Sequence, residues 1–250
     1  MSMTPASPAL RPLSVGEILD RAFALYRGNF ASMLATALAI YAPLAALQSA
    51  VWSAGWGTLF MTALPFAWCG CTALLLGALT TQAGRAYMGM PSGTGDAVGS
   101  ALRRIVSLVV VFVLTLVGMF LGLFGLIIGA ALVWVLLFAA IPAVALEGLG
   151  PFAALRRSTE LAEGDWMRIF LVLLVAFIIA ALPGLALTAI VGQIGEGMNL
   201  TAQAVSQALS TLLSAITYPY SVAATVVMYY DRRVRAEGLD VQLLEAAIGA

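Results

Sequence analysis

The chain has no histidine and no lysine, and only 10% of its 250 residues are charged. The absence of histidine removes the commonest general base and metal ligand, and with it the usual Ser-His and Cys-His catalytic arrangements. The two cysteines, Cys69 and Cys71, lie two positions apart, so on a helix they point to nearly opposite sides. They are badly placed to share a metal, and small packing residues are the plainer interpretation. We expect no cofactor and no nucleic-acid partner.

Long uncharged runs dominate what is present. Apolar residues make up 62% of the chain, against about 45–50% in an average soluble domain. About 20 apolar residues cross the hydrocarbon core of a bilayer as a helix. Four stretches without any charged residue therefore predict two, two, one and one spans, namely 28–84, 105–146, 169–195 and 197–230. The six spans are predicted at approximately 30–52, 62–84, 105–123, 126–146, 167–192 and 203–229.

The charges predict the topology. All 12 basic residues are arginines, and with six spans every one of them falls on the same side as both termini, leaving Glu196 as the only charge on the other side. Arginine and lysine concentrate in cytoplasmic loops, so both termini are predicted to be cytoplasmic. An arginine-only, alanine- and glycine-rich composition favours a GC-rich bacterium, and hence the inner (cytoplasmic) membrane.

An internal repeat suggests the architecture. Ser14 and Glu17 have the spacing of a capping box that opens an amphipathic helix. Residues 19–30 are similar to residues 155–166, and in both segments a helix ends at a glycine, Gly28 or Gly164, followed by Asn or Asp and then an aromatic residue. A left-handed glycine cap and a side-chain cap on the next helix would explain this pattern.

A weaker third copy at 102–104 precedes the third span. The predicted fold is therefore all-α: a polytopic membrane protein with six transmembrane helices, arranged as three hairpins that each follow an interfacial amphipathic helix. The predicted divisions are a disordered leader at 1–13, a six-helix membrane domain at 14–238 and a short cytoplasmic amphipathic tail at 239–250.

Two features could carry function. Glu147 directly follows the fourth span, and a carboxylate at that depth usually has a partner or a role; we expect an ion pair with Arg156, Arg157 or another interfacial arginine, with proton or substrate handling as the alternative. The sixth span carries a polar stripe at helical spacing, comprising Gln203, Gln207, Ser210, Thr211, Ser214, Thr217, Tyr218, Ser221 and Thr225. Hydrogen bonding between helices is the simpler interpretation. The alternative is a wet pathway lined by Gln203, Gln207, Ser214, Tyr218 and Ser221.

Three segments resemble the bacterial glycerophosphoryl diester phosphodiesterase membrane-domain family. They contain Glu17, Asp20 and Arg21 near the start; Glu147, Arg156, Arg157 and Ser158 in the middle, ahead of the repeat glycine Gly164; and Tyr230, Asp231, Arg233, Arg235, Glu237 and Gly238 near the end. The resemblance implies a membrane unit that, in the members that give the family its name, is joined to a separate catalytic barrel. A barrel of that kind needs about 250 residues, and these 250 residues are spent in the membrane, so no enzyme activity is expected.

The leading hypothesis is a non-catalytic integral membrane protein. It would act as an accessory or scaffold subunit, in contact with the lipid bilayer and with another membrane or cytoplasmic protein. A transporter or permeation-type protein using the sixth-span stripe is the alternative. A membrane-embedded enzyme ranks third, because the Gly93-x-Gly95-Asp96 and Tyr230-Asp231 matches to intramembrane aspartyl proteases occur in reversed order.

Overall fold

The computed structural model describes residues 11–54, 56, 62–194 and 200–239, and these residues are helical without strands. The prediction of an all-α fold is thereby confirmed. The elements, in chain order, are α1 (Val15–Gly28), α2 (Phe30–Ser53), α4 (Leu64–Tyr87), α5 (Thr94–Arg103), α6 (Ile105–Gly122), η1 (Leu123–Gly125), α7 (Leu126–Leu136), α8 (Ala140–Pro142), η2 (Ala143–Glu147), α9 (Pro151–Ala162), α10 (Trp166–Ile194) and α11 (Leu200–Glu237).

Five stretches in the described residues are helical, long and apolar enough to cross a membrane: Phe30–Val51, Leu64–Tyr87, Ile105–Glu147, Trp166–Ala186 and Ala208–Glu237. Four of them coincide with predicted spans. The predicted third and fourth spans fall together in the remaining stretch, Ile105–Glu147, which is bent back on itself.

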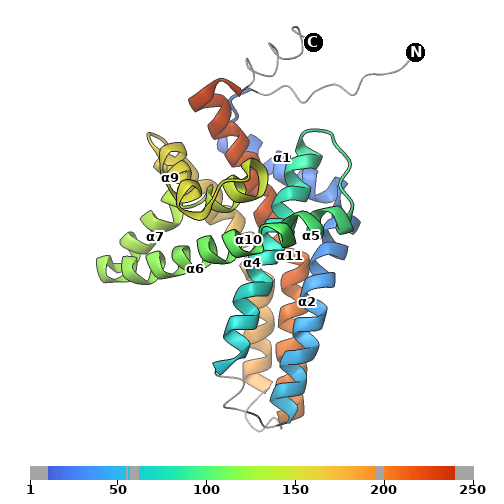
Figure 1. Ribbon diagram of the computed structural model, residues 1–250. Helices are drawn as coiled ribbons and strands as arrows, with labels where there is room; N and C mark the ends of the chain where they lie inside the picture. Colours follow the sequence, from blue (N-terminus) through green and yellow to red (C-terminus); the bar gives the residue numbers. More distant parts are fainter. Residues whose placement is uncertain (1–10, 55, 57–61, 195–199, 240–250) are drawn as a thin grey trace, which may run out of the picture.

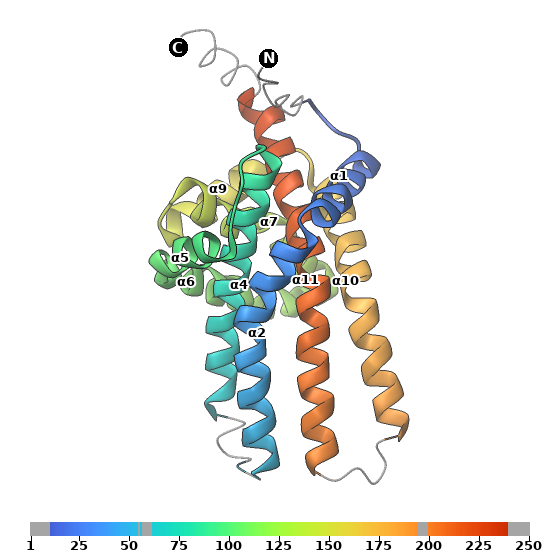
Figure 2. The same ribbon diagram turned by 90° about the vertical axis from the view of Figure 1, so that its right-hand side faces the viewer.

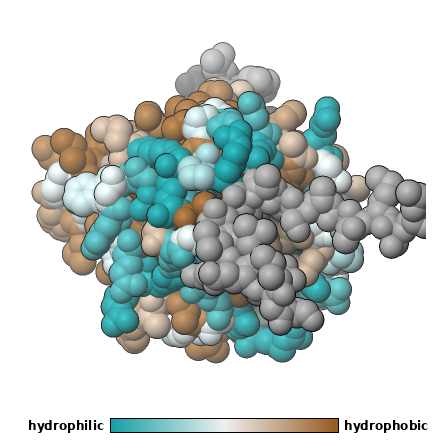
Figure 3. All heavy atoms as spheres, turned by 90° about the horizontal axis from the view of Figure 1, so that it is seen from above, coloured by the Kyte–Doolittle hydropathy of each residue, from teal (hydrophilic) through white to brown (hydrophobic). Residues whose placement is uncertain are grey.

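Four long helices, α2, α4, α10 and α11, run side by side as a bundle (Figures 1 and 2). Helix α11 packs against α2 on one side and α10 on the other. The α6–α7 pair projects sideways from this bundle, while α1, α5 and α9 lie towards the end where both termini are found (Figure 1). Seen from that end, hydrophilic side chains gather across the face, and hydrophobic ones line the edge on the side where α6 and α7 project (Figure 3).

Glycines on α4 allow the close packing that joins the bundle to the α6–α7 pair. A Cβ atom added to Gly77 would lie 2.3 Å from the Leu108 side chain of α6, and one added to Gly84 would lie 2.6 Å from Leu146 of η2. Small residues let membrane helices approach closely. The neighbouring alanines of α4, Ala73, Ala78 and Ala83, are fully buried in the same core.

The start of α1 is as predicted. The backbone N–H of Glu17 donates to the Ser14 side chain, and the backbone N–H of Ser14 donates to the Glu17 carboxylate at 2.8 Å, which completes the capping box. Arg11 also pairs with Glu17. The Ser14 backbone bond, followed by the Arg11 bond, lowers the pKa of Glu17 to about 2. Residues 1–10 of the predicted leader lie outside the described residues, but Leu13, at the end of that stretch, is buried.

The two copies of the repeat end differently, which corrects one prediction. Gly164 adopts the left-handed conformation, with φ of +86°, but Gly28 does not. At the first copy, the side chain of Asn29 donates to the carbonyl of Leu25 and closes α1 instead of capping α2. At the second copy, the side chain of Asp165 binds arginines. The polar residue after the glycine therefore serves a different purpose in each copy.

Candidate functional site

The three segments of the sequence motif meet at the end of the bundle near the termini. The last turns of α11 lie beside η2, α9 and the residues that precede α1, so residues 82 and 218 positions apart come into contact. They form two groups of alternating charge, one around Glu147 and one around Asp231.

The Glu147 cluster comprises Glu147, Arg157, Tyr229, Arg233 and Glu237. Arg157 pairs with Glu147 at 3.2 Å and also with Glu237, while Arg233 pairs with Glu237 at 3.0 Å and approaches Glu147 at 3.7 Å. The Tyr229 hydroxyl donates to Glu147, and the Arg233 guanidinium lies 5.8 Å from the centre of the Tyr229 ring. The bond to the Glu237 carboxylate raises the pKa of Arg157. The predicted pairing of Glu147 with Arg157 is confirmed.

The Asp231 cluster comprises Asp165, Arg168, Asp231, Arg232 and Arg235. The Asp231 carboxylate, whose side chain is 0% exposed, pairs with Arg168 and Arg235 at 3.0 Å each. Asp165 pairs with Arg232 and, at 3.6 Å, with Arg168. Asp231 and Arg235 lie one helical turn apart on α11. Charge-assisted hydrogen bonds of this kind are stronger than neutral ones.

The Asp231 cluster also holds the backbone of Leu13. The Leu13 N–H donates to Asp231 at 2.7 Å, while its carbonyl accepts from Arg235 at 2.9 Å and from Arg168. Both backbone groups of one residue are thus bound by side chains from α10 and α11. This arrangement holds the segment before α1 against the start of α10 and the last turns of α11.

A third contact of the motif runs through aromatic rings. Tyr230 of α11 stacks on Tyr87 of α4, with ring centres 5.0 Å apart. Arg21 of α1 donates to the Tyr87 hydroxyl at 3.4 Å. The sequence predicted Arg21 and Tyr230 but not Tyr87, which joins them.

Ser158 and Arg104 stabilise the irregular return from α7. Ser158 is fully buried on α9; its hydroxyl accepts from the Ala139 N–H at 2.9 Å and donates to the Leu136 carbonyl at 2.8 Å. These two groups flank the break where the predicted fourth span stops being a continuous helix. Arg104 donates to the carbonyls of Val144 and Ala145 in η2, both at 2.7 Å. The side chains of Ser158 and Arg104 therefore stabilise the break, because they bind backbone groups that the end of a helix leaves without helical partners.

Replacing Ser158 by alanine should lower the free energy of unfolding by about 1–3 kcal/mol, because a buried N–H and a buried carbonyl lose their partner. The matched control is Ser221→Ala, which removes one bond to Ala176 of α10 and should cost only about 0.6 kcal/mol. Thermal unfolding in detergent compares the two. Equal losses would mean that Ser158 does not hold the break.

Some predicted residues stand apart from the clusters. Asp20 is exposed on α1, Glu17 belongs to its capping box, and exposed Arg156 pairs with Glu160 on the outside of α9. Gly238 ends α11 in the left-handed conformation. Five members of the site were not predicted from the sequence, namely Arg104, Asp165, Arg168, Tyr229 and Arg232. For Asp165 and Arg168, three positions apart at the start of a span, the spacing was an available signal.

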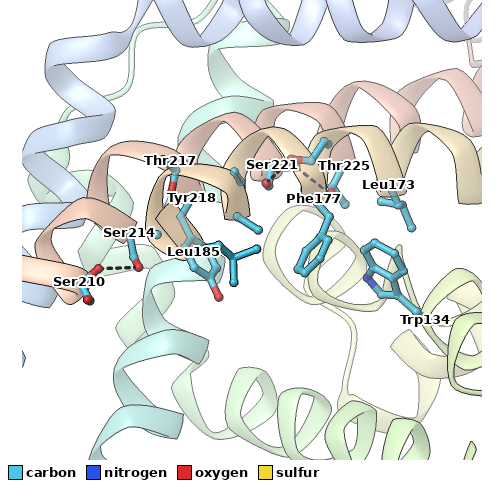
Figure 4. Close-up of a pocket in the computed structure, with 14 residues that line it drawn as sticks. Trp134, Leu173, Phe177, Leu185, Ser210, Ser214, Thr217, Tyr218, Ser221 and Thr225 are labelled. Carbon is cyan, nitrogen blue, oxygen red and sulfur yellow. Dashed lines mark hydrogen bonds between the residues drawn. The ribbon is translucent and has the colours of Figure 1, made fainter. Parts of the chain in front are cut away.

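The polar stripe of α11 lines a cavity of about 490 Å³ between α10 and α11, at whose edge lies Trp134 of α7. Figure 4 shows the hydroxyl-bearing side chains of α11 on one side of it, facing Phe177 and Leu185 of α10. The α11 residues that line the cavity are Ser210, Ser214, Thr217, Tyr218, Ser221 and Thr225. The predicted pathway residues Ser214, Tyr218 and Ser221 are among them, whereas the side chains of Gln203 and Gln207 lie outside the described residues.

The hydroxyls of the stripe are largely engaged with backbone. Ser214 donates to the Ser210 carbonyl at 2.9 Å, Thr225 to the Ser221 carbonyl at 2.9 Å, and Ser221 to Ala176 of α10 at 3.2 Å. Thr211, on another side of the helix, donates to Gln48 of α2 at 2.9 Å. The opposite wall, from α10 and α7, is apolar. The cavity therefore presents a row of weak polar groups along one side of an apolar groove.

Comparison with protein families gives a match to the family described as Domain of unknown function (DUF7847), over residues 13–232. No curated protein and no solved structure matches the chain. The matched region begins at Leu13 and ends at Arg232, so it includes both Leu13 and Asp231, which are joined by a hydrogen bond. Because the match covers most of its length, the chain belongs to the DUF7847 family.

Proposed function

We propose that this protein is a non-catalytic integral membrane protein that serves as an accessory or scaffold subunit for a membrane-associated partner. The observation that carries the proposal is the pair of charged clusters. Both motif carboxylates, Glu147 and Asp231, are held between arginines, which fixes α9, α10, α11 and the chain before α1 against one another. Such pairing suits a rigid docking platform better than acid–base chemistry, for which a carboxylate needs access to substrate.

The resemblance to the glycerophosphoryl diester phosphodiesterase membrane-domain family is consistent with this role. In that comparison the membrane unit accompanies a catalytic barrel and does not itself perform the reaction. Hydrolysis of glycerophosphodiesters that tracked the pure protein, and was lost on Glu147→Gln, would contradict the proposal.

The outer face of α9 is the surface best suited to a partner. Phe152, Arg156 and Glu160 lie four residues apart, so they share one side of the helix, and all three are exposed. The inner face of α9 is fixed by Ser158 and Arg157. An exposed aromatic side chain beside an exposed ion pair on a firmly packed helix suits a protein-binding surface.

Charge reversal at Arg156 should separate a scaffold from a transporter. We expect a partner that co-purifies at a fixed ratio with the wild-type protein and is lost from the Phe152→Ser/Arg156→Glu double variant. Arg27→Glu, an exposed reversal on α1, is the matched control and should retain the partner. Quantitative mass spectrometry of the purified complexes measures the ratio.

The second candidate function is that of a transporter or permeation-type protein, and the cavity between α10 and α11 favours it. Pro183 of α10 and Pro219 of α11 lie inside the two helices that line the cavity, and proline-containing spans are where transporters often bind substrate. Solute flux into reconstituted vesicles that is abolished by Ser214→Leu, but not by Arg156→Glu, would favour this function over the scaffold.

We propose a bacterial inner-membrane location with both termini in the cytoplasm. The arginines support this orientation, as does the order of elements, in which α1, α5 and α9 each precede a pair of long apolar segments and would lie along the interface. In sealed cells, a cysteine replacing Phe152 should resist an impermeant maleimide and one replacing Ala54 should react, with Cys69 and Cys71 changed to alanine. Reaction at position 152 but not at position 54 would show that the protein has the opposite orientation in the membrane.

A further inference from the structure

The α6–η1–α7 hairpin is among the most apolar segments that the structure describes, yet it does not run with the bundle. Residues 105–146 contain no charge, and the stretch Ile105–Glu147 has a mean hydropathy of 2.8. Figure 1 shows α6 and α7 directed away from α2, α4, α10 and α11, crosswise to their common direction. A pair of membrane-crossing helices would be expected to lie alongside the other four.

The lengths of the two limbs fit this direction. Helix α6 has 18 residues and α7 has 11, which correspond to about 27 Å and about 17 Å at 1.5 Å per residue. The hydrocarbon core is about 30 Å thick. Helix α7 is far too short to cross it, and the chain beyond Leu136 does not extend the limb. Instead the chain turns into the protein, where Ala139, Ala143 and Val144 are fully buried.

The end of the hairpin is suited to hydrocarbon and not to water. Phe124, Ile127 and Ile128 at the turn are 81%, 82% and 77% exposed. The sequence from Leu121 to Ile128 contains no polar side chain, whereas the five residues between α10 and α11 in the sequence include Glu196 and Asn199. A crossing hairpin would bring these large apolar side chains out into water on the far side of the membrane.

The base of the hairpin marks the depth at which it leaves the bundle. Helix α6 begins directly after Arg104, whose guanidinium is bonded to the carbonyls of η2, where the return limb ends. Both limbs of the hairpin therefore leave the bundle close to Arg104, on the side of the membrane where the arginines lie. An apolar groove of about 420 Å³ separates α7 from the start of α10 and is lined by Ile127, Ile128, Leu132, Trp166, Met167 and Phe170, among others. Exposed Trp166 is a residue type that favours the membrane interface.

From these observations we infer that the α6–η1–α7 hairpin enters only the leaflet on the arginine side and lies along it as a wedge. The chain then crosses the membrane four times, through α2, α4, α10 and α11, and not the six times predicted from hydropathy. Because both numbers are even, both termini and all arginines stay on one side. The acyl chains of that leaflet cover the exposed hairpin surface and fill the groove beside α7. They are continuous with the lipid around α10. The inference holds whichever side faces the cytoplasm, and it does not depend on the scaffold role.

The test places single cysteines in the full-length protein with Cys69→Ala and Cys71→Ala, reconstituted in phosphatidylcholine vesicles. Phe124→Cys and Ile127→Cys report on the hairpin, Ala54→Cys on the far side and Phe152→Cys on the arginine side. We expect both hairpin cysteines to resist an impermeant maleimide from either side, because a thiol in lipid does not ionise. A fluorophore attached to them from detergent before reconstitution should be quenched most by lipids spin-labelled near the headgroup end of the acyl chain.

Reaction of the hairpin cysteines from the side that labels Ala54→Cys would show a crossing hairpin and overturn the inference. So would quenching that is strongest at the bilayer midplane. Disulfide formation between copies at position 124, without quenching by any lipid label, would assign the surface to a second copy of the chain and would equally overturn it. The two hairpin positions guard against a variant that fails to fold.

Discussion

Replacing Asp231 by alanine should lower the free energy of unfolding by about 3–5 kcal/mol, the cost typical of removing one partner from a buried ion pair. The Asp231 carboxylate is fully buried and faces Arg168, which is itself only 16% exposed. Without it, the charge of Arg168 keeps only the longer contact with Asp165, and the N–H of Leu13 loses its acceptor. Arg235 is more exposed and can turn towards water.

Two variants separate charge from packing in this experiment. Asp231→Asn keeps an oxygen acceptor for Leu13 but removes the charge, so it should fall between the wild type and Asp231→Ala. Arg156→Ala breaks an exposed pair with Glu160 and should cost at most about 1 kcal/mol. Unfolding midpoints in detergent, together with protease sensitivity of the chain before α1, measure these effects. A loss for Asp231→Ala no larger than for Arg156→Ala would show that the cluster does not stabilise the fold.

The second large effect is expected at the tip of the α6–η1–α7 hairpin. A Cβ atom on Gly129 of α7 would lie 2.2 Å from the carbonyl oxygen of Gly122 in α6, and one on Gly122 would lie 2.8 Å from the backbone of Gly129 and Ala130. Backbone atoms cannot move aside as a flexible side chain can. Gly129→Val should therefore force the two limbs apart and lower the free energy of unfolding by about 1–3 kcal/mol, as overpacking usually does.

The matched control is Gly125→Ala, because a Cβ at that position meets nothing within 4 Å. It should leave the stability unchanged within about 0.5 kcal/mol, as an unconstrained substitution does. The separation of the limbs can be followed directly as the distance between spin labels at positions 116 and 132, whose leucine side chains are exposed. An unchanged distance in Gly129→Val would mean that the close approach of the two glycines does not hold the hairpin together.

Local rules explain which features the sequence could predict. Apolar runs gave the positions of α2, α4, α10 and α11, and the spacing of Ser14 and Glu17 gave the capping box, because both depend on neighbours within a few residues. The direction of the α6–α7 hairpin could not be read in the same way. A helix that crosses a bilayer and one that lies in a single leaflet can both be uncharged and apolar, so hydropathy does not distinguish them.

The sequence predicted several residues of the site but few of the contacts between them. The resemblance identified Glu147, Arg157 and Asp231, and charge pairing anticipated the Glu147–Arg157 bond. The role of Ser158 was hidden, since it depends on backbone groups freed by a break that a continuous apolar run does not reveal. The role of Leu13 was hidden for a related reason: the Asp231 cluster binds its backbone, which every residue possesses.

The bond between Leu13 and Asp231 also constrains how the protein is made. The two residues are 218 positions apart, and a ribosome adding 5–20 residues per second takes roughly 10–40 s to bridge that interval. During that time α1 and α2 have left the ribosome, but Asp231, which binds the backbone of Leu13 ahead of α1, has not yet been synthesised. When α10 appears, Asp165 is available to Arg168 in the same turn, so this arginine has a counterion before its final one is synthesised. The arrival of Asp231 closes the chain into a loop, and assembly at this end of the bundle is therefore completed only after α11 has been translated.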